Sequence, residues 1–176
     1  TSPVVMASVG GGVDVSGSLF EDSFSGGRNP AGGAEKFEGL GGNDDINGGG
    51  GLDRAIYSRA ADDTGIDVQL AAGIVTGGID TGTDTLRSVE AIWGTDFDDT
   101  YDARGFTASG DNSSVNSGSG DTGVSSSFNE FEGGAGDDTV YGNGNTRVAF
   151  THATGGVVVT LGAEGSGTAD VNDSVA

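Results

Sequence analysis

The sequence contains no cysteine, one histidine and only seven lysine and arginine residues among 176. Without cysteine, neither disulfide bonds nor thiolate metal sites can hold the chain together. The shortage of basic residues argues against nucleic acid as a partner, because phosphate backbones are bound by lysine and arginine. It argues against an anionic membrane surface for the same reason. No run of 18 apolar residues is present, so we expect no membrane span.

Glycine and acidic residues dominate what is present. Glycine supplies 36 residues, and 27 aspartates and glutamates give a formal net charge of −20. Only 34% of the residues are hydrophobic, a composition close to that of disordered chains unless something neutralises the carboxylates. Metal ions are the natural candidates. The first 30 residues lack the basic start and apolar core of a signal peptide, and we expect the sequence to be a segment of a longer protein.

Internal repetition organises the chain at a coarse level. Residues 17–25 (GSLFEDSFS) match residues 94–102 (GTDFDDTYD), and residues 35–50 match residues 129–144. The offset between the two matches changes because of a serine- and glycine-rich insertion at 103–127, which we expect to be a surface loop. We therefore divide the chain into three parts. They are a lead-in segment (1–16), a first repeat unit (17–93) and a second repeat unit (94–176) that contains the insertion.

A nine-residue pattern recurs inside each unit, with glycines first, an acidic residue sixth and an apolar residue eighth. It is clearest at 39–47 (GLGGNDDIN), 48–56 (GGGGLDRAI) and 133–141 (GGAGDDTVY), and looser copies begin at residues 17, 30, 79, 94 and 124. Glycines let the chain turn, and the last three residues are expected to extend as a short strand. The eighth-position residues are expected to form a narrow core: Phe24, Phe37, Ile46, Ala55, Tyr101, Phe131 and Val140.

Two such nonapeptides return the chain to the same side, so residues 18 apart are expected to stack in parallel strands about 4.8 Å apart. The sixth-position acids then form two files, one on each edge. Glu35 stacks with Asp53, and Asp22 stacks with Asp44 once residues 26–29 are looped out. Two carboxylates at that spacing repel by roughly 3 kcal/mol at an effective dielectric of 20. Calcium takes six to eight oxygens at about 2.3–2.6 Å, so one ion fits between stacked turns.

The nonapeptide GGxGxDxUx, with U a large apolar residue, resembles the RTX or haemolysin-type calcium-binding repeat. The stretches GGGGLDRAIY and GGAGDDTVY carry this resemblance. The blocks at 65–78 and 82–95 also look like the spacer of that family, so the resemblance covers most of residues 17–162. It implies an all-β fold, namely a right-handed parallel β-roll or β-helix solenoid with short strands and calcium-binding turns. It also implies type I secretion.

The resemblance further implies which residues hold the several calcium ions. In that family the ligands are the sixth-position aspartate and the carbonyls of positions one and three. Carried over, these are Gly39, Gly41, Asp44, Gly48, Gly50, Asp53, Gly133, Ala135 and Asp138, with Asp22, Glu35, Asp84, Asp99 and Asn129 in the looser turns. Asn129 lacks the charge, and Thr146 replaces the acid that Asp53 provides in the first unit. We expect the Asn129/Thr146 edge to bind weakly or not at all.

Other chemistry has less support in the sequence. The acidic pairs at 98–99 and 137–138 lie in the repeat register, which argues against a catalytic dyad. His152 aligns with Arg59, so we expect a surface residue rather than a general base. GSGDTG at 118–123 fits a nucleotide-binding glycine motif, but it lies in the insertion without a preceding strand. We therefore expect no enzymatic activity.

We expect a calcium-binding structural module of a larger secreted or cell-surface bacterial protein, of the adhesin or surface-layer type, that orders on binding calcium after export. The alternative is the non-catalytic repeat region of an exported enzyme or toxin. A polysaccharide lyase would need basic catalytic residues, and an ice-binding protein would need a flat array of threonines; the sequence displays neither. The expected partners are calcium ions, neighbouring repeats, and self-assembly or cell-surface components. Arg54 and Arg147 are expected to form salt bridges with the acid of a neighbouring turn, and the alternative is a contact with a partner.

Overall fold

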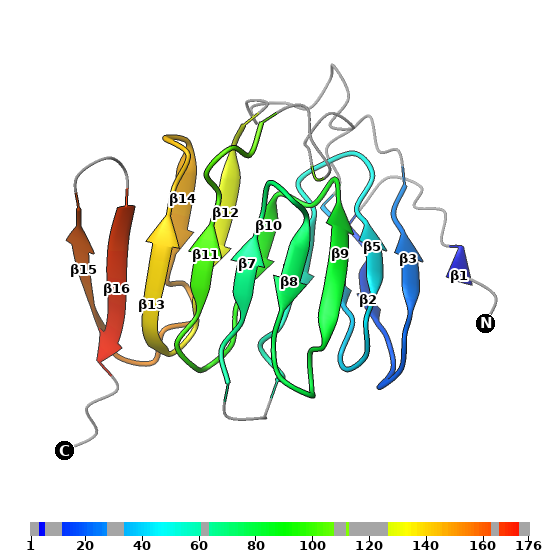
Figure 1. Ribbon diagram of the computed structural model, residues 1–176, viewed down its shortest axis with the longest axis horizontal. Coiled ribbons are helices and arrows are strands. Elements are labelled where there is room, and N and C mark those ends of the chain that lie inside the picture. Colours follow the sequence, from blue (N-terminus) through cyan, green and yellow to red (C-terminus); the bar gives the residue numbers. More distant parts are fainter. Residues whose placement is uncertain are drawn as a thin grey trace.

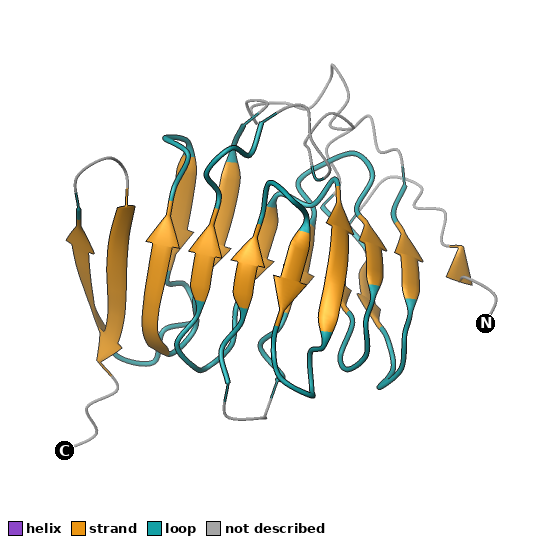
Figure 2. Ribbon diagram, in the orientation of Figure 1, coloured by secondary structure: helices purple, strands orange, loops and turns teal. Residues whose placement is uncertain are grey.

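The structure is a computed structural model that describes residues 4–5, 12–27, 34–60, 64–107, 112, 127–162 and 166–172. These residues form strands and no helix, so none of them forms a helix long and apolar enough to cross a membrane. The strands make two sheets that lie face to face as two layers (Figure 2). The expected all-β class is confirmed.

Ten strands form the larger sheet, in the order β1-β3-β5-β9-β8-β7-β11-β13-β16-β15, and six form the smaller, in the order β14-β12-β10-β6-β4-β2 (Figure 1). The ten-stranded sheet contains β1 (Val4–Val5), β3 (Ser23–Ser25), β5 (Asp45–Asn47), β7 (Asp67–Gln69), β8 (Ile74–Thr76), β9 (Thr83–Arg87), β11 (Thr100–Asp102), β13 (Gly136–Tyr141), β15 (Gly156–Leu161) and β16 (Ser166–Asn172). The six-stranded sheet contains β2 (Asp14–Ser16), β4 (Lys36–Glu38), β6 (Arg54–Ile56), β10 (Ala91–Trp93), β12 (Asn129–Glu132) and β14 (Thr146–Ala149).

The chain passes from one sheet to the other after almost every strand, and neighbouring strands then pair in parallel. The exceptions are β7–β8–β9 and β15–β16, which stay in the ten-stranded sheet and pair antiparallel, and β16 also pairs antiparallel with β13. The strands β3, β4, β5, β6 and β11 occupy positions seven to nine of their nonapeptides, as the repeat predicts. Glycine-rich residues therefore form the turns, and the three residues after them form the strands.

The strand registers follow the spacing of the repeat. Lys36 pairs with Arg54, 18 residues later, as two uninterrupted nonapeptides predict. Phe24 pairs with Ile46, 22 residues later, as predicted if four residues are looped out between them. Side chains at position eight consequently point between the sheets. All seven predicted core residues are buried, and their packing includes the stacked rings of Tyr101 and Phe131, whose centroids are 4.7 Å apart.

The meander β7–β8–β9 widens the ten-stranded sheet between β5 and β11, whereas β6 pairs directly with β10 in the other sheet. The insertion at 103–127 contributes to the core beside it. Ala103, Phe106 and Asn112 are buried, so the expectation of a surface loop is wrong for these residues. The Asn112 amide donates to the carbonyls of Leu70 and Val89 and accepts the Val89 N–H, which ties the insertion to the meander. Residues 108–111 and 113–126 lie outside the described residues.

Candidate functional site

Sixth-position acids line the lower edge, which we define as the turns that lead from the six-stranded sheet into the ten-stranded sheet, together with the turn between β8 and β9 (Figure 1). The N–H of Asp22 donates to Asp44 Oδ1 at 2.8 Å, and the N–H of Asp44 donates to Asp84 Oδ1 at 2.8 Å. Beyond the meander, the N–H of Asp99 donates to Asp138 Oδ1 at 3.0 Å. Each carboxylate thus binds the backbone of the coil before it, and the predicted file is present in two parts.

A second file lines the upper edge, which we define as the turns that lead from the ten-stranded sheet into the six-stranded sheet. The N–H of Glu35 donates to Asp53 Oδ1 at 2.9 Å, and the N–H of Asp53 donates to Glu90 Oε2 at 3.1 Å. The strand registers continue this file to Asn129 and Thr146. Glu90 is a site residue that the sequence pattern missed, because the residues before it contain no glycine-rich turn. Only its place directly before β10 indicates its role.

Several carboxylate oxygens in these files have no hydrogen-bond partner within the part of the chain that the structure describes. We call them the open oxygens: Oδ2 of Asp44, Asp53, Asp84 and Asp138, and both oxygens of Glu35. All five side chains are at most 2% exposed. A buried charged acceptor that lacks a partner costs about 1–3 kcal/mol or more. So many in two columns require neutralisation, either by bound protons or by a cation.

Two of the predicted ligands have partners inside their own turns. The N–H of Ser18 donates to Asp22 Oδ2 at 2.6 Å, and its hydroxyl donates to the same oxygen at 2.9 Å. The N–H of Thr95 donates to Asp99 Oδ2 and its hydroxyl donates to Asp99 Oδ1, both at 2.8 Å. A serine or threonine at position two therefore provides the hydrogen bonds that the open oxygens lack.

For Asp44, Asp53 and Asp138, the backbone at position two explains this division. In the glycine-rich turns this position has a left-handed φ, of 69° at Leu40, 94° at Gly49 and 98° at Gly134. Ser18 and Thr95 lie outside that region, and their N–H groups point at the carboxylate. Leu40 holds its left-handed conformation without being glycine, at a cost of about 1–2 kcal/mol.

Position-one glycines lie directly against the open oxygens. A Cβ on Gly39 would be 1.9 Å from Asp44 Oδ2, and one on Gly133 would be 1.7 Å from Asp138 Oδ2. A Cβ on Gly48 would be 2.6 Å from Asp53 Oδ2. No side chain fits between these groups, so glycine is required here by space.

The position-one carbonyls approach the carboxylates of the neighbouring coil. The carbonyl oxygen of Gly39 and Asp22 Oδ2 both lie 2.6 Å from the point where a Cβ of Gly17 would be. The Gly133 carbonyl and Asp99 Oδ2 converge in the same way on Gly94, at 2.9 and 2.1 Å. The position-three residues Gly41, Gly50 and Ala135 lie in the same turns, and their role as carbonyl ligands stays a prediction.

Burial makes the charged forms of these acids costly. It raises the pKa of Asp138 to about 8, of Asp84 to about 7 and of Asp44 to about 6. Burial, reinforced by Glu35, raises the pKa of Asp53 well above its usual range. The Tyr57 hydroxyl is buried next to the Asp84 carboxylate, and burial together with that carboxylate raises the pKa of Tyr57. Without a cation at neutral pH, Asp138 would thus be mostly protonated, Asp84 about half protonated and Asp44 mostly charged.

The chemistry of the donors suits a hard cation. The open oxygens and the neighbouring carbonyls are all oxygen ligands, which calcium prefers, and thiolates are absent from the whole sequence. Among the described residues, no group of three or more acidic or histidine side chains comes close enough to hold a metal by side chains alone. Backbone carbonyls must therefore complete any site, as the nonapeptide predicts. The Asn129 side chain accepts the Tyr101 hydroxyl and donates to Ser127, so its amide is already engaged.

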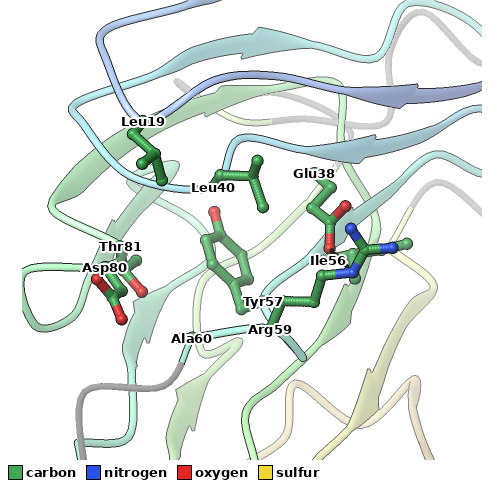
Figure 3. Close-up of a pocket in the computed structure, with 9 residues that line it drawn as sticks. All are labelled: Leu19, Glu38, Leu40, Ile56, Tyr57, Arg59, Ala60, Asp80 and Thr81. Atoms are coloured by element: carbon green, nitrogen blue, oxygen red, sulfur yellow. Dashed lines mark ion pairs between the residues drawn. The ribbon is translucent and has the colours of Figure 1, made fainter.

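A small cavity lies beside the lower edge in the first unit (Figure 3). Its volume is about 130 Å³, less than the roughly 300–1,000 Å³ of most small-molecule sites. The ring of Tyr57 lies in its middle, next to Leu40, and Arg59 forms an ion pair with Glu38 at 3.2 Å at one side (Figure 3). The other lining residues are Leu19, Ile56, Ala60, Asp80 and Thr81. We assign no ligand to this cavity.

The arginines matched between the units form the expected salt bridges, but they share one acid. Arg54 and Arg147 both pair with Glu130, which is buried in β12. Arg54 reaches across β10 because Ala91, the residue between them, has a small side chain. These contacts neutralise a buried acid on the outer face of the six-stranded sheet.

His152 is half exposed, as predicted, and it pairs with a buried acid as Arg59 does in the first unit. Its Nδ1 lies 2.8 Å from Glu132 Oε1, and its ring stacks on Trp93 with centroids 4.0 Å apart. The Thr151 hydroxyl contacts the same Nδ1 at 3.2 Å. A catalytic triad needs the hydroxyl and the acid on opposite ring nitrogens, so this arrangement does not activate a nucleophile.

The strand registers also line up threonines on the outer face of the ten-stranded sheet, which the sequence did not reveal. Thr83 pairs with Thr76, and Thr100 pairs with Thr139. Asp67 lies between these two pairs in the same row. The row is therefore not the uninterrupted threonine array expected of an ice-binding surface.

Comparison with known proteins adds no relatives: no family model, no curated protein and no solved structure matches the chain. The resemblance to the RTX repeat therefore rests on the nonapeptide and the spacer-like blocks of the sequence. Arguments about function rest on the two acid files and on the hydrogen bonds described above.

Proposed function

We propose that the chain is a calcium-binding structural module, built as a right-handed parallel β-roll or β-helix solenoid of the RTX type. It would belong to a larger secreted or cell-surface bacterial protein, such as an adhesin or a surface-layer protein. The alternation of the chain between two sheets supports the solenoid, because each pair of nonapeptides then makes one coil. The 18-residue register between β4 and β6 supports it as well.

The observation that carries the proposal is the set of open oxygens. Buried carboxylates without partners raise the free energy of the folded chain, and a bound cation removes that cost. The strongest sites would combine Asp44 with Gly39, Asp53 with Gly48, and Asp138 with Gly133. Asp84, Glu35 and Glu90 would contribute carboxylates from neighbouring coils. Bound calcium supplies positive charge and coordination that tie adjacent coils together.

Two groups of sites should differ in affinity. Asp22 and Asp99 already accept N–H and hydroxyl donors, so calcium gains less by binding there. The Asn129/Thr146 edge has neither a charge nor an open amide, and it should be the weakest. Because two of the three strongest sites, at Asp44 and Asp53, lie in the first unit, that unit would stay partly ordered when calcium is scarce.

Because calcium binding is coupled to folding, the calcium concentration would decide where the module folds. Weak sites, of about 10⁻⁴ to 10⁻³ M as in extracellular modules, stay empty in the cytosol and fill outside the cell. An ion present at ten times its dissociation constant contributes roughly 1.4 kcal/mol per site. Several sites together approach the whole stability of a typical domain. Folding would then follow export, when calcium becomes available.

Far-UV circular dichroism in EDTA, followed by titration with calcium and separately with magnesium, tests this function. At about pH 8 we expect a largely unfolded spectrum in EDTA and a strand spectrum in millimolar calcium, with little rescue by magnesium. Magnesium prefers a tighter octahedral site than these turns provide. Isothermal titration calorimetry of the triple variant Asp44→Asn/Asp53→Asn/Asp138→Asn should show the loss of the tightest sites. A strand spectrum in EDTA that calcium leaves unchanged contradicts the proposal.

A further inference from the structure

Large apolar side chains are exposed together at the lower edge of the first unit. Leu19, Phe20 and Ile79 are 72%, 78% and 87% exposed. They lie in two turns that are far apart in the sequence, one between β2 and β3 and the other between β8 and β9 (Figure 1). The Leu19 Cα and the Ile79 carbonyl oxygen both lie 3.7 Å from the point where a Cβ of Gly41 would be. Apolar side chains gathered in this way on a surface mark an interaction site.

A groove joins these side chains. Its volume is about 720 Å³, within the roughly 300–1,000 Å³ of most binding sites. It is lined by Leu19, Phe20, Glu21, Gly42, Asn43, Ile79 and Gly82. A Cβ on Gly42 would be 2.6 Å from the carbonyl carbon of Phe20, and one on Gly82 would be 1.9 Å from the Gly42 carbonyl oxygen. The glycines thus let three turns stack closely, so apolar side chains from the two outer turns line the same groove.

The repeat itself does not require an apolar residue where Leu19 lies. Position three is Gly41, Gly50 or Ala135 in the strict turns, and it is Asp96 in the turn of the second unit that matches the turn of Leu19. Asp96 is exposed, and its turn still leads into a three-residue strand. The coil therefore forms with a small or charged residue at this position, and Leu19 is free for another role.

Leu40 enlarges the same apolar surface at a cost in backbone energy. Its φ of 69° is left-handed, whereas the strict turns place Gly49 and Gly134 at this position. A left-handed φ costs a residue with a side chain about 1–2 kcal/mol. Leu40 lines the small cavity of Figure 3 together with Leu19, which that cavity shares with the groove. Strain of this kind is typical of positions where the side chain has a function.

The charges around the groove are negative. The exposed Glu21 lines the groove, and Asp80, which follows Ile79, lines the adjoining cavity. Among the described residues, no lysine or arginine lines the groove. The whole chain has a net charge of −20, so its field attracts cationic partners and repels anionic ones. A second copy of this chain and an anionic membrane are both disfavoured for that reason.

We propose that this groove binds a peptide segment of another protein in which apolar side chains stand next to lysine or arginine. The apolar side chains of the segment pack between Leu19 and Ile79, and its cationic side chains pair with Glu21. Exposed ion pairs contribute little, so the apolar contacts supply most of the affinity and the charges favour cationic over anionic segments. The groove needs only the folded turns, and the proposal therefore does not depend on which ion stabilises them.

Fluorescence anisotropy of a labelled peptide tests the proposal, in a buffer where circular dichroism shows strand. The probe is a fluorescein-labelled peptide in which leucine and phenylalanine alternate with lysine, titrated with the full chain from about 1 μM to about 1 mM. We expect saturable binding. Peptides with serine in place of the apolar residues, or glutamate in place of lysine, should bind at least about tenfold more weakly.

Matched variants separate the groove from the general negative charge of the chain. Leu19→Ser and Ile79→Ser should each weaken binding at least about fivefold. Ile74→Ser is the control, because Ile74 is 40% exposed on β8 and does not line the groove, and it should leave binding unchanged. Glu21→Gln should weaken binding about twofold to threefold, whereas Asp96→Asn, which changes the net charge equally, should not.

Circular dichroism of each variant checks that it remains folded. No binding of the peptide at about 1 mM, or equal binding by Ile79→Ser and Ile74→Ser, overturns the proposal. Equal effects of Glu21→Gln and Asp96→Asn overturn it too, because net charge alone would then hold the peptide. Flotation with phosphatidylcholine vesicles covers the remaining occupant, and a chain that binds these vesicles but not the peptide also overturns it. Calcium binding is read from the unlabelled chain alone, so failure of peptide binding leaves the proposed calcium function intact.

Discussion

The turn that begins at Gly39 and the turn that begins at Gly17 place an aspartate at the same point of the coil but treat it differently. In the first, position two is left-handed and Asp44 keeps an open oxygen. In the second, Ser18 donates its N–H and its hydroxyl to Asp22. In these two turns, the backbone at one residue thus decides whether the aspartate is satisfied by the protein or is left for a cation.

The same contrast recurs in the second unit. Gly134 is left-handed and Asp138 has an open oxygen, whereas Thr95 donates to both oxygens of Asp99. Each unit therefore combines a turn that is complete by itself with turns that need a ligand. The complete turns can start the coil, and the open turns make its continuation depend on calcium.

The largest expected effect comes from pH, because several acids respond together. The folded-state pKa values of Asp138, Asp84 and Asp44 are raised to about 8, 7 and 6. The folded chain therefore holds more protons than the unfolded chain between an acid's usual pKa and its raised value. Its stability then falls as the pH rises through that range. In calcium-free buffer we expect strand content at about pH 5 that is lost between about pH 6 and 8.

Circular dichroism against pH in EDTA measures this loss, and calcium added at about pH 8 should reverse it. The variant Asp138→Asn should flatten the upper part of the curve, since its side chain has no proton to lose. A calcium-free chain that is more stable at about pH 8 than at about pH 5 contradicts the assignment of the open oxygens.

The second-largest effect concerns calcium affinity, which should differ between turns with an open oxygen and turns whose acid accepts donors from Ser18 or Thr95. Asp44→Asn removes the charge beside an open oxygen, and we expect the dissociation constant of that site to rise at least about tenfold, or about 1.4 kcal/mol. Asp22→Asn changes an acid that Ser18 already satisfies, and we expect less than about a threefold change. Isothermal titration calorimetry measures both. Equal losses of calcium affinity in the two variants would contradict the difference proposed between turns with a left-handed position two and turns with a serine or threonine there.

Space at position one gives a smaller effect on stability. Gly39→Ala places a Cβ 1.9 Å from Asp44 Oδ2, so the turn must open, at a cost of about 1–3 kcal/mol. At Gly156 no described atom lies within 4 Å of the corresponding point, so Gly156→Ala should change stability by less than about 0.5 kcal/mol. Urea unfolding in saturating calcium compares them. A Gly39→Ala variant as stable as Gly156→Ala would show that the carboxylate can move away freely.

Much of the fold could be predicted from the nonapeptide alone. Its spacing fixed the short strands, the pairing of Lys36 with Arg54 and the buried eighth position, because glycine turns and three-residue strands repeat with one period. Glu90 and the meander escaped prediction, since neither follows that period. The buried role of Asn112 escaped as well, because it depends on contacts with Leu70 and Val89 that are distant in sequence.

The division of the acids into satisfied and open was also missed, although a sequence signal for it exists. The loose turns have Ser18 or Thr95 at position two, and the strict turns have Leu40, Gly49 or Gly134. In both loose turns the hydroxyl lies four residues before the acid that it contacts. Whether it reaches the acid depends on the φ angle at position two, which the sequence alone does not specify.

Removal of one hydroxyl gives the smallest effect, and it tests the comparison most directly. Thr95→Ala deletes the hydroxyl bond to Asp99 Oδ1 and keeps the N–H bond to Oδ2. We expect a loss of about 1 kcal/mol in calcium-free urea unfolding at low pH, and Thr95→Ser should restore it. Burial already raises the pKa of Asp99 to about 6, so with one donor fewer its carboxylate should come to resemble that of Asp138. Calcium should then stabilise Thr95→Ala more than it stabilises Thr95→Ser, because the cation replaces the missing donor. An equal calcium response in the two variants would mean that the hydroxyl and the ion do not compete for the same carboxylate.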